Sequence, residues 1–339
     1  MAKKNIAWSD LGFSYMQTNS IVRVKFKDGK WGKTELLKDP IIPLHAAATC
    51  LHYGQAAFEG LKVFEMKNGE VAAFRPDENA KRMQNTAERL LMEEVSTSLF
   101  LDALKIVVND NLDYLPPYGT GASMYVRPLL IGSGARIGVQ PAEEYDFYIL
   151  VLPVGPYYKN GMSPIDALVQ TEYDRAAPNG LGHVKAGGNY AAGLYSDKVG
   201  KKRQFPISLY LDSKEHKYID EFGTSNFIGI SKDKKYVTPD SNSVLPSITN
   251  KSLMTLAKDF GMTVEQRKIA VEELADFVEV GSVGTAAVIT PISSVTYGEK
   301  VFTFGEKGVA GETLQKLYNR LQGIQYGDAE DKYGWMYKI

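Results

Sequence analysis

The chain has little of what several function classes require. Its 339 residues contain a single cysteine, Cys50, and only four histidines: His45, His52, His183 and His216. One cysteine cannot close an intramolecular disulfide, and the four histidines lack the spacing of a zinc site. We therefore expect a protein of a reducing, cytoplasmic compartment that carries no structural metal.

Long hydrophobic runs and an excess of one charge are also missing. The longest apolar run, Tyr148–Leu152, is far shorter than the roughly 20 residues that a membrane helix needs, and residues 1–20 lack the apolar core of a signal peptide. Lysine and arginine total 39 against 40 acidic residues, for a formal net charge of -1. The protein has no overall electrostatic field that would favour binding to nucleic acid or to an anionic membrane, so the expected partner is a small molecule.

Two common nucleotide motifs are incomplete. The segment Gly132–Gly138 is close to a dinucleotide-binding turn, but its final glycine comes one residue late. The segment Gly32–Thr34 lacks the upstream glycine of a phosphate-binding loop, and no G-x-S-x-G nucleophile motif is present. These absences disfavour nicotinamide enzymes, nucleotide hydrolases and serine esterases.

The length and the hydrophobic pattern predict two domains. Single cores stop growing at roughly 250 to 300 residues, which this chain exceeds. We expect a smaller N-terminal domain at 1–155, a connecting loop at 156–165 and a larger C-terminal domain at 166–339. Strands and helices do not alternate regularly, so the pattern favours an α+β fold with mixed or antiparallel sheets and flanking helices.

Local signals place the main elements. Alternation at 21–26, followed by a turn at 27–30, predicts a hairpin, and Pro76 and Asp77 begin a helix that continues to Leu91. Further expected strands are 123–128, 146–152, 208–211, 217–230 and 277–280, and further expected helices are 248–260 and 313–321.

The segment His183–Tyr190 contains the candidate catalytic residue. Lys185 stands beside two glycines, Gly187 and Gly188, which allow a bulky planar group to approach the backbone. A lysine whose pKa is lowered by burial or by nearby positive charge is a nucleophile toward carbonyl groups. A solvated surface lysine is the alternative, so this interpretation depends on support from other segments.

Such support comes from segments that could bind an anion. Pro246 and Ser247 open a predicted helix, so that backbone N–H groups lie beside Thr249, and an ordinary helix cap is the alternative. The small-residue turn 281–287 offers the Thr285 hydroxyl, with a plain strand connection as the alternative. Arg75, just before another helix, could bind the same anion through a charged, bidentate pair of hydrogen bonds.

Two more residues suit a cofactor that contains a pyridine ring. Glu221 lies in an alternating run, where its carboxylate could keep a ring nitrogen protonated and make the ring an electron sink. Tyr190 could bind a ring hydroxyl. A glutamate at the edge of a strand and a tyrosine in the core are the alternatives.

In their order along the chain, these segments resemble the branched-chain amino acid aminotransferases of the class IV family, which are fold type IV pyridoxal phosphate enzymes. The C-terminal IQYGDAEDKYGWM (324–336) is similar to that of their longer subgroup. The matching motifs are LHYGQAAFEG (51–60), FRP (74–76), YVRPLLIG (125–132), VKAGGNY (184–190), EFGTSNF (221–227), LPSIT (245–249) and VGTAAVITP (283–291).

The resemblance implies a homodimer that transfers amino groups from leucine, isoleucine or valine to 2-oxoglutarate with pyridoxal 5′-phosphate. It implies that Lys185 binds the cofactor as an imine and later shuttles the substrate proton. Glu221 would pair with the pyridine nitrogen and Tyr190 with the phenolic oxygen. The remaining implied contacts are Arg75, Ile248, Thr249 and Thr285 for the phosphate, and Tyr53 (from the neighbouring subunit), Phe58, Tyr125, Arg127, Tyr157, Thr224, Ala286 and Ala287 for the substrate.

The sequence departs from the family pattern at a few positions. Ser247 stands where glycine is usual and Val283 where serine is common, but the N–H donors remain. Ala287 and Thr290 occupy the positions of a redox-active cysteine pair found in some members, so no thiol switch is expected. A D-amino acid aminotransferase, an aminodeoxychorismate lyase-like enzyme, or a cofactor-free binding protein with the same fold remain as alternatives.

Overall fold

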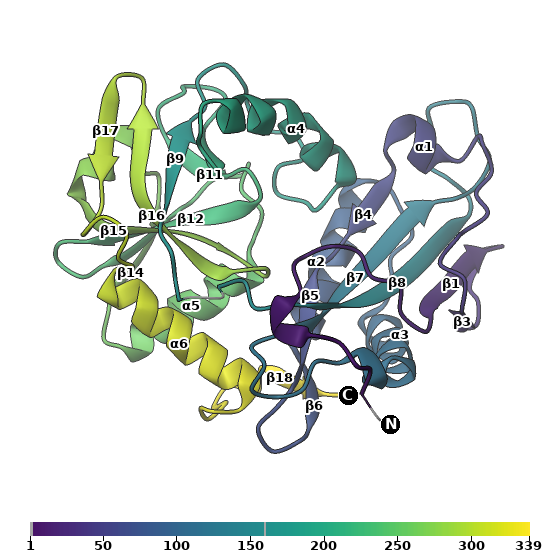
Figure 1. Cartoon of the computed structure of the whole chain (residues 1–339). Coiled ribbons are helices and arrows are strands. Elements are labelled where there is room, and N and C mark those ends of the chain that lie inside the picture. Colours follow the sequence, from purple (N-terminus) through teal and green to yellow (C-terminus); the bar gives the residue numbers. More distant parts are fainter. Residues whose placement is uncertain (1–2, 159–160) are drawn as a thin grey trace. The chain divides into compact units, whose positions relative to one another are not determined.

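The computed structural model describes residues 3–158 and 161–339, and the chain divides into two compact units. Unit 1 consists of Met1–Tyr157, Val184–Gly188 and Gly323–Ile339, and unit 2 of Tyr158–His183 and Asn189–Gln322. The α+β class with mixed sheets is confirmed (Figure 1). The boundaries 1–155, 156–165 and 166–339 stay a prediction, and residues 159 and 160 of the expected loop lie outside the described residues. Packing joins the lysine segment and the C-terminal residues to unit 1, which the sequence did not indicate.

Unit 1 is built on one sheet whose strand order, within the described residues, is β18-β6-β5-β7-β8-β1-β2, with β3 beside β1 and β4 beside β7. Helices α2 and α3 pack against each other, and α3 packs on β8 and β1. The elements are η1 (Trp8–Asp10), β1 (Ile21–Lys27), β2 (Lys30–Trp31), β3 (Glu35–Leu37), α1 (Thr49–Tyr53), β4 (Ala56–Phe58), β5 (Leu61–Glu65), β6 (Val71–Phe74), α2 (Pro76–Arg89), α3 (Thr97–Asp110), η2 (Leu112–Tyr114), β7 (Ser123–Gly132), β8 (Tyr145–Val154) and β18 (Met336–Lys338).

Local chemistry explains the elements that the sequence located in unit 1. Asp28 and Gly29 both have positive φ (51° and 75°), which is the two-residue turn that an Asp-Gly pair favours between antiparallel strands. Helix α2 begins at Pro76, as expected. Its buried side chains, which include Met83 and Ala87, join the core beneath the sheet. The hairpin and the helix are therefore confirmed.

Unit 2 holds a second sheet, which closes on itself. In the described residues the order is β11-β10-β9-β16-β15-β12-β13-β14, β17 pairs with β16, and β11 also pairs with β12. Pairs β9–β10, β9–β16 and β13–β14 are parallel. The elements are β9 (Ile165–Val169), β10 (Ile207–Leu211), β11 (Ile219–Phe222), β12 (Ser225–Ser231), β13 (Tyr236–Pro239), α5 (Ile248–Asp259), β14 (Val264–Arg267), η3 (Val271–Asp276), β15 (Phe277–Gly284), β16 (Val288–Tyr297) and β17 (Lys300–Thr303), and the helices α4 (Gly187–Lys202) and α6 (Glu312–Tyr326) each contain residues assigned to both units.

One expected strand is wrong. The run 217–230 is a hairpin of β11 and β12, because Gly223 and Thr224 turn the chain and Phe222 pairs with Ser225. The alternation of side chains continues through the turn, which hid the break. Helices α3 and α4 were not expected from the sequence at all.

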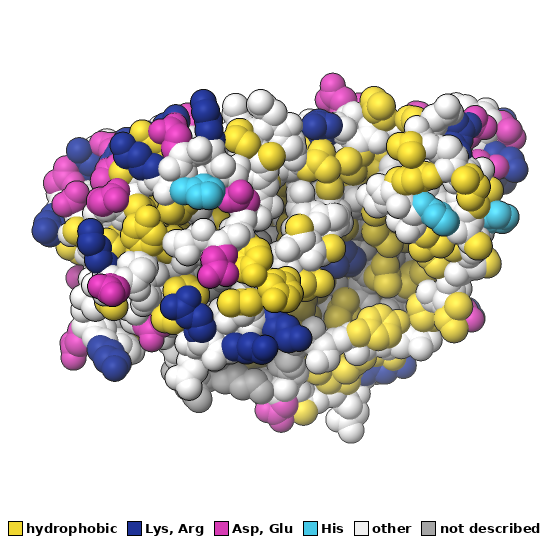
Figure 2. Space-filling model, turned by 90° about the horizontal axis from the view of Figure 1, so that it is seen from above, with side chains coloured by type: hydrophobic (Ala, Val, Ile, Leu, Met, Phe, Trp, Pro, Cys, Tyr) yellow, Lys and Arg dark blue, Asp and Glu magenta, His cyan; other side chains and the backbone are white. Residues whose placement is uncertain are grey.

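The surface agrees with the balanced composition. Basic and acidic side chains are interspersed on the face shown in Figure 2 rather than gathered by sign. Among the described residues, no helix is long and apolar enough to cross a membrane. In the same residues, no group of three or more histidine, cysteine, aspartate or glutamate side chains could hold a metal ion.

Candidate active site

Lys185 is held at its backbone from both sides. Its N–H donates to the Thr86 hydroxyl on α2 at 3.1 Å, and its carbonyl accepts from the Phe58 N–H on β4 at 3.2 Å. The Thr86 hydroxyl in turn donates to the Arg82 carbonyl at 2.9 Å. Because α4 begins only at Gly187, these bonds fix a residue that lies in no regular element. These hydrogen bonds fix the backbone position of Lys185 without involving its side chain.

Three of the predicted substrate residues of unit 1, Phe58, Tyr125 and Arg127, form a connected group with this lysine. The ring of Phe58 has Lys185 Nζ 4.8 Å from its centre and the Arg127 guanidinium at 4.9 Å. Arg127 donates to the Tyr125 hydroxyl at 2.9 Å, and its buried Nε has no hydrogen-bond partner within the described residues. Gly60 makes room, because a Cβ there would collide with the Tyr125 hydroxyl. The group combines an amine, a guanidinium and aromatic walls.

A buried carboxylate that the sequence analysis missed lies close enough to Lys185 to interact with its charge. Glu59 is fully buried and accepts from Arg82 at 2.7 and 2.8 Å and from Asn79 at 2.7 Å. Burial alone would raise the pKa of Glu59, but Arg82, followed by Lys185 and Asn79, lowers this pKa below its usual range. Asn79, Arg82 and Thr86 lie three and four residues apart, on one face of α2. This face of α2 therefore carries both the donors that hold Glu59 and the backbone anchor of Lys185.

Arg75 is the N-cap of α2 and has a left-handed backbone, with φ 48° and ψ 46°. Its N–H donates to the carbonyl of Trp335 at 2.8 Å, and its guanidinium lies 5.2 Å from the Trp335 ring centre. A non-glycine residue in this conformation costs energy and is concentrated at functional sites. The strained backbone is consistent with the anion-binding role expected for Arg75.

In unit 2, Glu221 is surrounded by donors. One carboxylate oxygen forms an ion pair with Arg175 at 2.6 Å and accepts the Leu245 N–H at 3.1 Å, and the other accepts from Asn226 at 3.0 Å. Glu221 is 3% exposed. These contacts favour the ionised carboxylate, the form that could keep a pyridine nitrogen protonated. Arg175 and Asn226 were not singled out from the sequence.

Asn226 connects Glu221 to the predicted phosphate segments. Its amide donates to the Leu245 carbonyl at 3.0 Å, just before α5, and its backbone pairs with Val283 on β15. Ser247 caps α5 by accepting the Asn250 N–H at 3.1 Å, as expected. Unit 2 thus brings Glu221, the N-terminus of α5 and the strand that leads to the turn 285–287 close to one another.

The first turn of α5 and the turn 285–287 offer donors of the expected kind. Ile248 and Thr249 are the first residues of α5, where helix N–H groups lack intrahelical acceptors. Thr285 lies in the connection between β15 and β16. This connection ends at Val288, whose φ of 65° is a left-handed value rare for a β-branched residue. Backbone strain thus occurs beside this predicted segment as well.

The other expected residues are more dispersed. Tyr53 on α1 is 42% exposed and donates to the Ile137 carbonyl, and Tyr157, at the end of unit 1, is 55% exposed. Tyr190 lies in the first turn of α4. Three residues lie in tight turns, namely Thr224 between β11 and β12 and Ala286 and Ala287 between β15 and β16.

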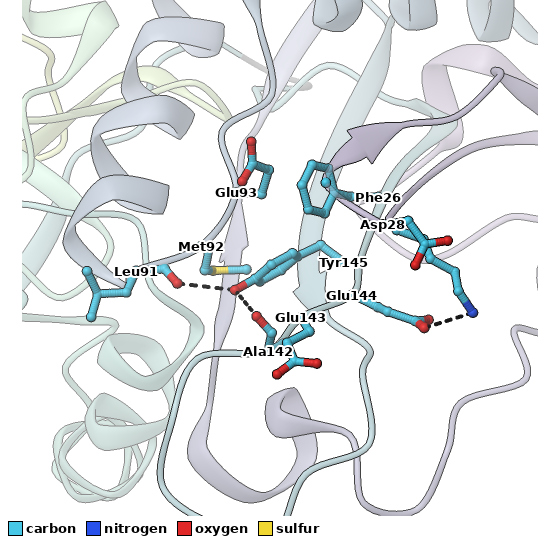
Figure 3. Close-up of a pocket in the computed structure, with 11 residues that line it drawn as sticks. Phe26, Asp28, Leu91, Met92, Glu93, Ala142, Glu143, Glu144 and Tyr145 are labelled. Atoms are coloured by element: carbon cyan, nitrogen blue, oxygen red, sulfur yellow. Dashed lines mark hydrogen bonds and ion pairs between the residues drawn. The ribbon is translucent and has the colours of Figure 1, made fainter.

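A separate cavity of about 610 Å³ lies in unit 1 (Figure 3). Tyr145 closes one side, where its hydroxyl donates to the carbonyls of Leu91 and Ala142, and Lys27 on the rim pairs with Glu144. None of the predicted site residues lines this cavity. It is therefore not the site that the motifs indicate.

Comparison with known proteins gives matches along the whole chain. The model of the family "Amino-transferase class IV" matches residues 56–295. The chain is 46% identical to the branched-chain-amino-acid aminotransferase of Haemophilus influenzae, with 99% of each covered, and 44% identical to that of Helicobacter pylori, with 99% of this chain and 98% of the relative covered. The crystal structure of the Escherichia coli branched-chain amino acid aminotransferase matches with a TM-score of 0.80 at 28% identity, over 94% of this chain and 99% of that one. These matches confirm the resemblance that the ordered motifs indicated.

Proposed function

The chain belongs to the class IV amino-transferase family and is an aminotransferase of branched-chain amino acids, and we propose that it works with pyridoxal 5′-phosphate bound covalently to Lys185. The amino group of leucine, isoleucine or valine is transferred to 2-oxoglutarate, which gives a branched 2-oxo acid and L-glutamate. Pyridoxal phosphate supplies an electron-accepting ring for the carbanion left when the substrate α-proton departs. Another branched-chain amino acid aminotransferase of the same fold has been solved with pyridoxamine 5′-phosphate.

The residues of the chain fit this cofactor. A buried carboxylate held by donors suits a pyridinium nitrogen, and a capped helix N-terminus suits a phosphate. In the proposal, Glu221 pairs with the ring nitrogen, Tyr190 with the phenolic oxygen, and Lys185 Nζ holds and moves the α-proton. The phosphate is held by Arg75, the first turn of α5 at Ile248 and Thr249, and Thr285.

The observation that carries this proposal is the group around Lys185, in which one amine with a fixed backbone lies against the Phe58 ring that Arg127 also contacts. Purified protein loaded with pyridoxal phosphate is expected to change its visible absorbance to that of the pyridoxamine form when L-leucine is added, and to form glutamate when 2-oxoglutarate follows. D-alanine serves as the comparison donor. Preference for D-alanine would support the D-amino acid aminotransferase, and no spectral response to either donor would contradict an aminotransferase.

Arg127 is proposed to distinguish the two kinds of substrate. Its guanidinium, with a buried Nε that lacks a partner among the described residues, can receive the second carboxylate of glutamate, whereas Phe58 and Tyr125 offer apolar walls to a branched side chain. We expect Arg127→Ala to lower kcat/KM for glutamate by about tenfold or more relative to leucine, because charge-assisted bonds contribute roughly 1.5–3 kcal/mol. Steady-state rates with both donors measure this ratio. Equal losses for both would remove the proposed dual recognition.

A homodimer is proposed on the basis of an exposed apolar patch on unit 1. Leu51 and Tyr53 on α1 are 60% and 42% exposed, and Ile137 and Val139 are 70% and 81% exposed. The Tyr53 hydroxyl bonds to the Ile137 carbonyl, so these side chains belong to one surface. A second copy would cover it. Sedimentation is expected to give twice the 37.5 kDa of one chain, and a Val139→Asp variant should shift the protein toward the monomer.

A cytoplasmic location is also proposed. Cys50, the single cysteine, is half-buried, desolvation raises its pKa, and a lone thiol of this kind is compatible with a reducing compartment. Cell fractionation followed by immunodetection checks this location.

A further inference from the structure

The last residues of the chain return to the strand that precedes Arg75. Strand β18 pairs antiparallel with β6, with Met336 opposite Phe74, and the Ile339 N–H donates to the Val71 carbonyl at 3.0 Å. Arg75 follows β6 directly. The C-terminal strand therefore places the residue before Met336, which is Trp335, next to Arg75.

Trp335 makes two different contacts with Arg75. Its carbonyl accepts the Arg75 N–H at 2.8 Å, and its indole lies 5.2 Å from the guanidinium carbon. The indole is itself fixed, since it stacks on Tyr333 at 4.6 Å, meets Phe74 edge-on at 5.9 Å and is 8% exposed. The aromatic face thus holds the side chain, while the carbonyl holds the backbone.

Both contacts compensate for an unfavourable geometry. Arg75 adopts a left-handed backbone directly before Pro76, and such a conformation persists only where the surroundings enforce it. A guanidinium that stacks by its face keeps its N–H edge available for bidentate bonds to an anion. The Glu78 carboxylate, 3.9 Å from the Arg75 guanidinium, would compete for that edge.

We propose that Trp335 is a positioning residue that sets the affinity of the protein for the phosphate of its cofactor by holding the Arg75 guanidinium. This rests on the proposed role of Arg75 in pyridoxal phosphate binding. The C-terminal strand is then part of the cofactor site, although Trp335 and Arg75 are far apart in the sequence. Loss of the indole weakens phosphate binding and leaves binding of the ring unchanged.

The test compares two ligands that differ only in the phosphate. Apoprotein is titrated with pyridoxal phosphate and with pyridoxal, and both dissociation constants are measured by absorbance. Trp335→Leu is expected to weaken pyridoxal phosphate by roughly three- to thirtyfold, the range of cation–π contacts, with pyridoxal unchanged. Trp335→Phe keeps an aromatic face, so its dissociation constant for pyridoxal phosphate should lie between those of the wild type and Trp335→Leu. Trp31→Leu is the matched control, because Trp31 also packs on a phenylalanine of unit 1 and lies far from Arg75 in the sheet order.

A double variant tests whether Trp335 affects the affinity for pyridoxal phosphate through Arg75. In an Arg75→Ala background, Trp335→Leu should cause no further loss of pyridoxal phosphate affinity. Equal weakening of both ligands, or an additive loss in that background, would overturn the proposal. If Trp335→Leu does not fold, Trp335→Phe in the two backgrounds decides the same question. Wild-type protein that binds neither ligand would instead refute the proposed function.

Discussion

Replacement of Lys185 by alanine is expected to lower leucine transamination by about 10³-fold or more, since the variant loses both the covalent link to the cofactor and the group that moves the α-proton. The protein should remain folded, because the bonds of the Lys185 backbone to Thr86 and Phe58 do not involve the removed side chain. Transamination rates and a thermal unfolding curve measure the two effects separately.

A Lys185→Arg variant separates charge from nucleophilicity. Arginine keeps a cation beside Phe58 and Glu59, but its guanidinium does not lose its proton at accessible pH. We expect this variant to be as inactive as the alanine variant and to yield no covalent adduct with the cofactor after borohydride reduction. Full turnover in either variant, or an adduct on another residue, would show that the amine of Lys185 is not the reactive group.

Short-range chemistry explains the parts of the fold that the sequence predicted. The pair Asp28-Gly29 suits one type of turn, and Ser247 with Gly261 frames α5 by ordinary cap signals. The helical spacing of the hydrophobic residues predicted α2. In each case the information lies within a few residues of the element itself, so it can be read without knowledge of the rest of the chain.

The supporting residues that were missed depend on contacts distant in sequence. Arg175 lies before Lys185 in an irregular segment, and only the fold places it against Glu221. Trp335 meets Arg75 because a strand of three residues, too short for a periodic signal, pairs with β6. Helix α4 begins at two glycines, which carry no helix-start signal. Sequence motifs located the candidate residues, whereas their supporting partners required the structure.

A Glu221→Gln variant is expected to lower activity by about 10²- to 10³-fold, the usual effect of removing one preorganised electrostatic contact. Glutamine keeps the size and one acceptor oxygen for the Leu245 N–H or Asn226, but it cannot keep a ring nitrogen protonated. It also leaves Arg175, whose side chain is 9% exposed, without its counter-charge. Breaking such a buried pair costs roughly 3 kcal/mol of folding free energy, so the variant should unfold at a lower temperature as well as turn over more slowly.

A double variant that removes the charges of both Glu221 and Arg175 separates the effect on stability from the effect on catalysis. In Glu221→Gln combined with Arg175→Met, no buried cation remains unpaired at this position, so the free energy of unfolding should recover toward that of the wild type. Activity should stay as low as in the single variant, because the carboxylate that would face the ring nitrogen is still absent. Denaturant unfolding and leucine transamination on the same preparations give both quantities. Recovery of activity together with stability would mean that Glu221 acts only through the fold, and the electron-sink role would then have to be assigned elsewhere.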